Sequence, residues 1–129
     1  MACNPLNIWR PIPAGSTFKP TTTGDANAYN VTIFVTKNGT AAPPLRHDDI
    51  AGGTAAVPFA ANDEYVFDVV LAIFNKPTQD ITLDLQVVDG GGTPVPVSDS
   101  SGGTRPAQCT STFNDPAQSP VLIKLIALA

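Results

Sequence analysis

The sequence EYVFDVVLAIFNKPTQDITLDLQVV, residues 64–88, decides the fold class. Residues 81–88 alternate between apolar and polar side chains, and this period of two predicts a β-strand with one face in solvent. Residues 65–74 carry apolar side chains on both faces, interrupted only by Asp68. We therefore predict two strands joined by a polar turn at residues 75–80. The first strand needs a cover on both faces, from its own domain or from a neighbour.

The composition favours an all-β domain around this stretch. The chain has 129 residues, the usual size of one domain, and only 14% of them are charged. Ten of its eleven acidic residues are Asp, which is favoured in turns and disfavoured inside helices. Thirteen Pro and ten Gly leave no room for a long helix. We predict a two-layer antiparallel β-sandwich of immunoglobulin-like or jelly-roll order at residues 29–129, preceded by an extended Pro-rich N-terminal arm at residues 1–28.

Three further segments before the C-terminal run have the pattern of strands. Residues 29–36 alternate between apolar and polar, and Asn38-Gly39 after them is the strongest short signal for a hairpin. The Pro-containing sequence that follows is a poor strand, so this turn either forms a hairpin or opens into a loop. Shorter strands are predicted at residues 54–61, at a sheet edge because of the proline they contain, and at residues 110–114.

The predicted arm carries the large aromatic side chains Trp9 and Phe18. Four prolines exclude a regular helix from it and restrict strands to sheet edges: Pro5, Pro11, Pro13 and Pro20. Trp9 is the single Trp of the chain, and two interpretations are open. It either folds back onto its own sandwich or reaches into a neighbouring subunit, where aromatic anchors dominate the binding energy.

The charge pattern argues against nucleic acid as a partner. The net charge is −4, and the seven basic residues are spread singly, so no basic face is available to neutralise phosphates. No apolar run reaches the roughly 18 residues of a membrane span. The N-terminus lacks the basic and apolar segments of a signal peptide. Because the sequence begins with Met, we expect a protein made without a leader; a leader removed before residue 1 is the alternative, and the localisation stays open.

Few residues are candidates for chemistry. Cys3 and Cys109 either pair, if the compartment is oxidising, or stay free thiols, and neither has the partners of a zinc site. His47 is the only histidine, and its carboxylate neighbours Asp48 and Asp49 are typical of a base or a metal ligand. No Ser or Cys near His47 in the sequence has the setting of a catalytic nucleophile. We predict that residues 46–49 form a polar loop. We also predict that the protein has no enzymatic activity, cofactor or metal.

Surplus apolar surface is the main indication of function. Residues 121–129, VLIKLIALA, are predicted as a C-terminal strand rather than a short helix, and this strand too has a second apolar face. We predict a structural subunit of a larger particle, such as a virion coat, decoration or tail component or a surface appendage, which associates with itself or with other subunits. The alternatives are a ligand-binding module, for example for carbohydrate, and a small hydrolase centred on His47. The predicted interface residues are Trp9, Phe18, Val66, Val70, Phe74 and Leu128.

Overall fold

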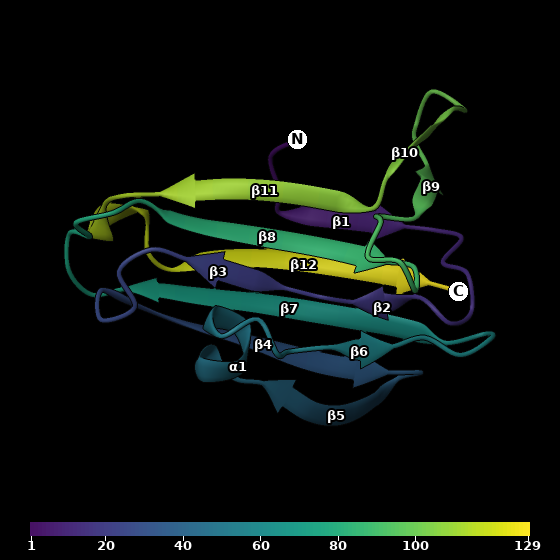
Figure 1. Ribbon diagram of the computed structural model, residues 1–129, viewed down its shortest axis with the longest axis horizontal. Helices are drawn as coiled ribbons and strands as arrows, with labels where there is room; N and C mark the ends of the chain where they lie inside the picture. Colours follow the sequence, from purple (N-terminus) through teal and green to yellow (C-terminus); the bar gives the residue numbers. More distant parts are fainter.

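A computed structural model describes residues 1–129 and contains two five-stranded sheets and a two-stranded ribbon (Figure 1). The first sheet, here the β7 sheet, has the order β1 (Leu6–Trp9), β12 (Val121–Leu128), β7 (Glu64–Ile73), β4 (Tyr29–Lys37) and β5 (Thr40–Leu45). The second, the β8 sheet, consists of β11 (Gln108–Phe113), β8 (Ile81–Val88), β2 (Thr17–Phe18) and β6 (Val57–Pro58), with β3 (Thr21–Thr23) also paired to β8. The ribbon is β9 (Pro96–Ser98) and β10 (Thr104–Pro106), and the helical turns are α1 (His47–Ala51) and η1 (Pro116–Gln118). The prediction of an all-β protein is confirmed.

The two strands of residues 64–88 lie in different sheets. β7 pairs with β4 on one side and with β12 on the other, whereas β8 pairs with β11, β2 and β3. The polar segment between them carries the chain from one sheet to the other. Each strand buries every second side chain in a common core between the sheets. All ladders of the two large sheets are antiparallel except that of β1, which runs parallel to β12.

Aromatic side chains fill the centre of this core. Phe18 of the β8 sheet stacks on Phe67 of the β7 sheet, with 3.9 Å between the ring centroids. Tyr65 stacks on Phe67 at 5.4 Å, and Phe59 meets Tyr65 edge to face at 5.0 Å. Offset-stacked and edge-to-face contacts of this kind add about 0.5–1.5 kcal/mol each beyond the area they bury. The aromatic cluster therefore joins the two sheets directly.

The predicted N-terminal arm is not confirmed, because residues 1–28 belong to both sheets. They supply β1 to the β7 sheet and β2 and β3 to the β8 sheet. In β1 the side chains alternate, so that Asn7 and Trp9 point inward and are buried while their neighbours are exposed. Trp9 and Phe18 thus lie in the core of their own chain. None of the four prolines lies within a strand, so they do not interrupt the pairing.

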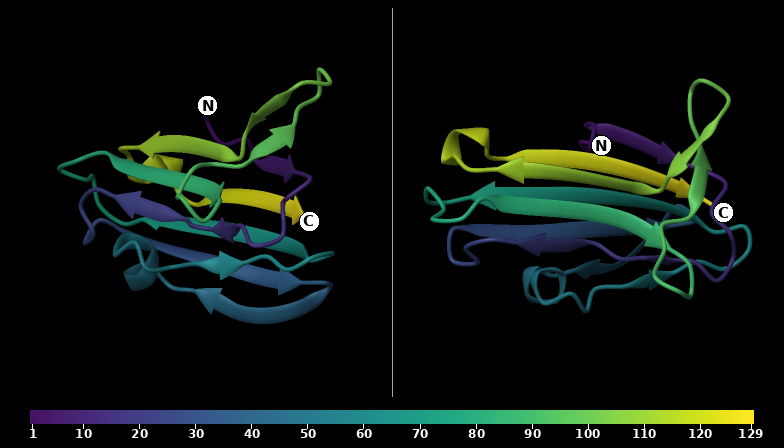
Figure 2. Two further views of the ribbon diagram at one scale, coloured as in Figure 1. Left: turned by 45° about the vertical axis from the view of Figure 1, so that its right-hand side comes forward. Right: turned by 45° about the horizontal axis from the view of Figure 1, so that its top comes forward.

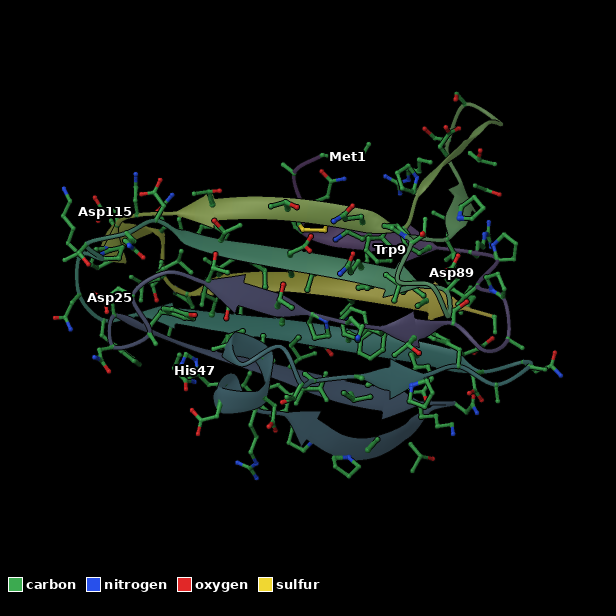
Figure 3. All side chains as sticks on the ribbon, in the orientation of Figure 1. Met1, Trp9, Asp25, His47, Asp89 and Asp115 are labelled. Atoms are coloured by element: carbon green, nitrogen blue, oxygen red, sulfur yellow. A yellow bond between two sulfur atoms is a disulfide. The ribbon has the colours of Figure 1, made fainter.

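A disulfide between Cys3 and Cys109 closes one side of the molecule, and it is the yellow bond in Figure 3. It joins the segment before β1 to β11, an edge strand of the other sheet. Two hydrogen bonds accompany it: Thr110 N–H donates to Met1 C=O at 2.8 Å, and Cys3 N–H donates to the Ser111 hydroxyl at 2.9 Å. The N-terminus is therefore held against the edge of the β8 sheet.

The remaining local predictions differ in their outcome. Asn38 and Gly39 form the two-residue loop of a hairpin, both with positive φ, as the Asn-Gly signal indicates. β5 forms after them despite its prolines, because it is an edge strand with a bulge opposite β4. Residues 121–128 are a strand, as predicted, and only Val57–Pro58 is a strand within 54–61.

The prediction of a polar loop at residues 46–49 was wrong. Residues 47–51 form the helical turn α1, which starts when Arg46 C=O accepts the N–H of Ile50 at 3.0 Å. Ile50 is fully buried and anchors the turn against the core. Ile50 lies one residue beyond the predicted loop, so the polar sequence of residues 46–49 does not indicate this buried contact.

Replacing both cysteines by serine is expected to lower the free energy of unfolding by about 2–4 kcal/mol, because the bond closes a long loop in the unfolded chain. Urea denaturation of the oxidised protein, the reduced protein and the double variant measures this. The reduced protein and the double variant should have the same urea midpoint. Equal midpoints for the oxidised protein and the double variant would contradict the prediction.

Candidate functional site

The outer face of the β7 sheet is apolar along its central strand. Alternate side chains of β7 point away from the core, and those on the outer face are Val66, Asp68, Val70 and Ala72. All four are half-buried by side chains of the neighbouring strands. No other element of the chain covers them, because α1, the ribbon and the second sheet lie elsewhere (Figures 1 and 2).

β12 extends this face on one side. Its register places Leu122 beside Val70 and Ile126 beside Val66. Residues directly opposite each other in an antiparallel pair share a face, so these side chains are also on the outer face. Leu122 is 62% exposed, although a large apolar side chain gains by burial.

β1 and β4 complete the face at its two sides. Leu6 and Ile8 of β1 lie beside Lys124 and Ile126 of β12, and Phe34 of β4 lies opposite Asp68 of β7. Only six large apolar side chains of the protein are exposed, and four of them are on this face. The apolar face is defined here as Leu6, Ile8, Phe34, Val66, Val70, Leu122, Ile126 and Leu128.

One ion pair lies in the middle of the apolar face. Lys124 Nζ is 3.8 Å from Asp68 Oδ1, and both side chains are about half exposed. A solvent-exposed pair of this kind contributes about 0–1 kcal/mol to stability. Next to it is a shallow hollow of about 280 Å³, lined in part by Val70, Leu122 and Pro5. The centre of the face therefore combines one positive charge, one negative charge and apolar walls.

The outer face of the β8 sheet has the opposite character. β8 presents Thr82, Asp84 and Gln86 there, and its neighbours β11 and β3 add further threonines. Asp84 accepts hydrogen bonds from the Thr110 hydroxyl at 3.0 Å and the Gln108 amide at 3.2 Å. Such a surface satisfies its polar groups with water and with itself. The two outer faces thus differ in polarity.

The predicted interface residues fall into three groups. Val66, Val70 and Leu128 lie on the apolar face and are half-buried. Phe74 is 60% exposed and lies one residue beyond the end of β7, so it is not part of the strand that forms the face. Trp9 and Phe18 are in the core, as described above, and offer no surface to a partner in this structure.

Five residues of the face were not among the predicted interface residues: Leu6, Ile8, Phe34, Leu122 and Ile126. Phe34 had a signal in the sequence, since it is a large apolar residue on the polar side of an alternating strand. Leu6 and Ile8 gave no such signal, because only their pairing with β12 places them beside Lys124 and Ile126.

His47 makes structural contacts with β4. Its Nδ1 accepts the backbone N–H of Val31 at 3.1 Å, and its ring meets the edge of Tyr29 at 4.9 Å (Figure 3). β5 pairs with β4 only from Ile33 onward, so Val31 has no partner from β5 and His47 supplies one. A polar hollow of about 390 Å³ beside it is lined by Asn30, Thr32, Pro44, Arg46 and Asp48, together with His47.

The remaining features to consider are metal ligands, membrane-spanning helices and titratable groups with a shifted pKa. No three His, Cys, Asp or Glu side chains gather as ligands for a metal ion. None of the helices has the length and apolar character needed to cross a membrane. The hydrogen bond from the Ser101 hydroxyl holds the pKa of Asp99 below its ordinary value, helped by the N–H groups of Gly103 and Ser101 and by the charge of Arg105, whereas desolvation raises it. These contacts order the loop between β9 and β10.

Comparisons of this chain with protein-family models, with curated proteins and with solved structures found no match.

The His47→Ala variant is expected to lose about 1–3 kcal/mol of stability, because the buried N–H of Val31 would be left without a partner. Urea denaturation measures the loss, and amide hydrogen exchange should show faster exchange at Val31. Asp48→Ala is the matched control, since Asp48 is exposed on the same helical turn. Unchanged stability and unchanged exchange at Val31 would refute this role.

Proposed function

We propose that this protein is a structural subunit without enzymatic activity, and that it assembles with copies of itself through the apolar face of the β7 sheet. The observation that carries the proposal is the concentration of exposed Leu, Ile and Phe side chains on that face. Contiguous apolar patches of this kind mark interaction sites on soluble proteins.

The size of the face suits an interface between subunits. Five strands spaced about 4.8 Å apart, with central strands of about eight residues rising about 3.3 Å each, span roughly 24 Å by 26 Å. A standard interface buries about 800 Å² on each partner, which is of the same order. Two sheets pack face to face at about 10 Å, so a second copy could lie directly on this surface.

The energy available from covering the face is also adequate. Full burial of a Leu, Ile or Phe side chain is worth about 1.5–3 kcal/mol. Leu6, Ile8, Phe34 and Leu122 are 45–62% exposed, so covering them yields roughly 3–6 kcal/mol before the costs of association. The half-buried residues of the face add to this sum.

The charges favour a second copy as the partner. Lys124 and Asp68 are adjacent at the centre of the face, one of each sign. A two-fold axis through this centre brings Lys124 of each copy toward Asp68 of the other, and like charges need not oppose each other. The face is therefore complementary to itself, as an isologous interface requires.

The wider role follows from the same features together with the low charge content. We propose a subunit of an ordered particle, such as a virion or a surface appendage, on a sandwich of immunoglobulin-like or jelly-roll order. Both orders are found in coat or cell-surface domains, although the fold alone does not assign a function. The alternative of a carbohydrate-binding module needs exposed aromatic rings beside polar groups; Trp9, Tyr29 and Tyr65 are all buried, and only Phe34 and Phe74 are exposed rings.

The double variant Phe34→Lys/Leu122→Lys is expected to dissociate the assembly, because each copy would place two added positive charges on the interface. Sedimentation equilibrium of the wild type should show oligomers, and the variant should bind itself at least about a hundredfold more weakly, or about 2.7 kcal/mol. The matched control is Thr23→Lys/Thr112→Lys, which adds the same charge to exposed positions on the outer face of the β8 sheet.

Two results would overturn the proposal. One is a wild type that stays monomeric at the highest soluble concentration. The other is an oligomer that the control variant weakens as much as the Phe34→Lys/Leu122→Lys variant does. Thermal unfolding of both variants separates loss of association from loss of folding, since all four positions are at the surface and outside the core.

A further inference from the structure

β1 is an edge strand of the β7 sheet, and its outer side is open. At the other end of the β7 sheet, β5 contains Pro43 and Pro44, which cannot donate hydrogen bonds to an added strand. In the β8 sheet, β6 has only two residues, one of them proline, and the N–H of Thr110 in β11 is taken by Met1. β1, with the sequence LNIW, has no proline and is covered by no other strand along its outer side.

The hydrogen bonds of β1 leave two residues free at that edge. Lys124 N–H donates to Pro5 C=O at 2.8 Å, and in a parallel ladder every second residue bonds to the same neighbour. Asn7 and Trp9 therefore face β12 with their main-chain groups. Leu6 and Ile8 direct their N–H and C=O groups away from it, and no hydrogen bond to another segment involves them.

A groove runs along this free edge, with a volume of about 620 Å³. On one side it is lined by Leu6, Ile8 and Arg10, and on the other by residues of the β9–β10 ribbon, including Ser98 and Arg105. The ribbon projects from the end of the molecule beside β1 (Figures 1 and 2). It is fastened there because Ser98 N–H donates to Arg10 C=O at 2.9 Å.

Two arginines that form no ion pair line the groove. Arg10 is exposed and forms no ion pair, since the single ion pair of the protein is that of Lys124 and Asp68. The Nε of Arg105 is buried without a hydrogen-bond partner, and one terminal nitrogen of its guanidinium contacts only the sulfur of Met1, at 3.2 Å. Asp99 also lines the groove, and the charge of Arg105 helps to lower its pKa, but its Oδ1 is already bonded to Ser101 and Gly103 and it forms no ion pair with Arg105.

We propose that this groove binds an extended acidic segment of a partner protein, which adds to β1 as a further strand. The N–H and C=O groups of Leu6 and Ile8 form hydrogen bonds with the main chain of the added segment. Arg10 and Arg105 bind the carboxylates of that segment. A free main-chain edge recognises a peptide rather than a small anion, and the two guanidinium groups select acidic side chains near one end of it. This contact uses the main-chain groups of Leu6 and Ile8 at the edge of the sheet, whereas the contact between apolar faces uses their side chains.

Fluorescence anisotropy with labelled synthetic peptides tests the proposal on the full-length protein. The probes are two peptides of alternating Val and Thr, one with a pair of Asp at its N-terminal end and one with the pair at its C-terminal end. At least one of them should bind, and the better one defines the direction of the added strand. The same peptide with Lys in place of Asp, or with N-methyl groups at alternate residues, should bind at least about tenfold more weakly. Failure of both acidic peptides to bind overturns the proposal, as does equal binding of the N-methylated peptide.

Substitutions in the protein locate the site. Arg10→Gln and Arg105→Gln should each weaken binding of the acidic peptide at least about tenfold. Arg105→Lys should weaken binding less, because the charge is kept. Arg46→Gln is the matched control, since Arg46 is exposed at the start of α1 outside this groove. Equal effects of Arg10→Gln and Arg46→Gln would refute the assignment.

The same titration in the Phe34→Lys/Leu122→Lys background separates the two proposals. Neither residue lines the groove, so the peptide should bind this variant as it binds the wild type. Binding that is lost together with self-association would place the peptide on the apolar face and refute the groove.

Discussion

The pairing of β7 with β4 on one side and β12 on the other is the interaction on which the rest of the structure depends. It extends over almost the whole length of β7, from Glu64 to Ile73. Because β7 is bonded on both sides, its inner side chains are fixed opposite the β8 sheet, where Phe67 stacks on Phe18. The same register fixes the outer side chains into rows with those of β12 and β4. The core and the apolar face are thus two consequences of one ladder.

The sequence predicted those parts of the fold that depend on local patterns. The period of two in residues 81–88 and the positive φ that Asn38-Gly39 favours are properties of short segments, and both appear in the structure. The N-terminal segment could not be predicted in the same way. Its strands are short and separated by prolines, and their stability comes from pairing with β12 and β8, which are distant in the sequence. The disulfide likewise depends on this pairing, which brings Cys3 beside β11.

The candidate site likewise contains residues that local sequence patterns predict and residues that depend on distant pairing. Val66, Val70 and Leu128 could be found from single strands, because each strand has more apolar residues than one buried face needs. The contribution of Leu6 could not, because it requires knowledge that β1 lies next to β12. Trp9 was ambiguous for a related reason. A large aromatic side chain suits a core and an interface equally, and only its position in the alternation of β1 places it inside.

The two proposed contacts differ in what they allow an assembly to do. A face that is complementary to itself pairs two copies about a two-fold axis and is then fully used. An edge that accepts a strand from a different surface is heterologous, so each contact leaves the partner's own edge free for another. Proteins usually block open edges, and this chain does so at β5 with prolines and at β11 with its own N-terminus. The edge of β1 has no such block and lies beside two arginines that form no ion pair, so an added acidic strand would leave each copy with a further edge to extend the assembly.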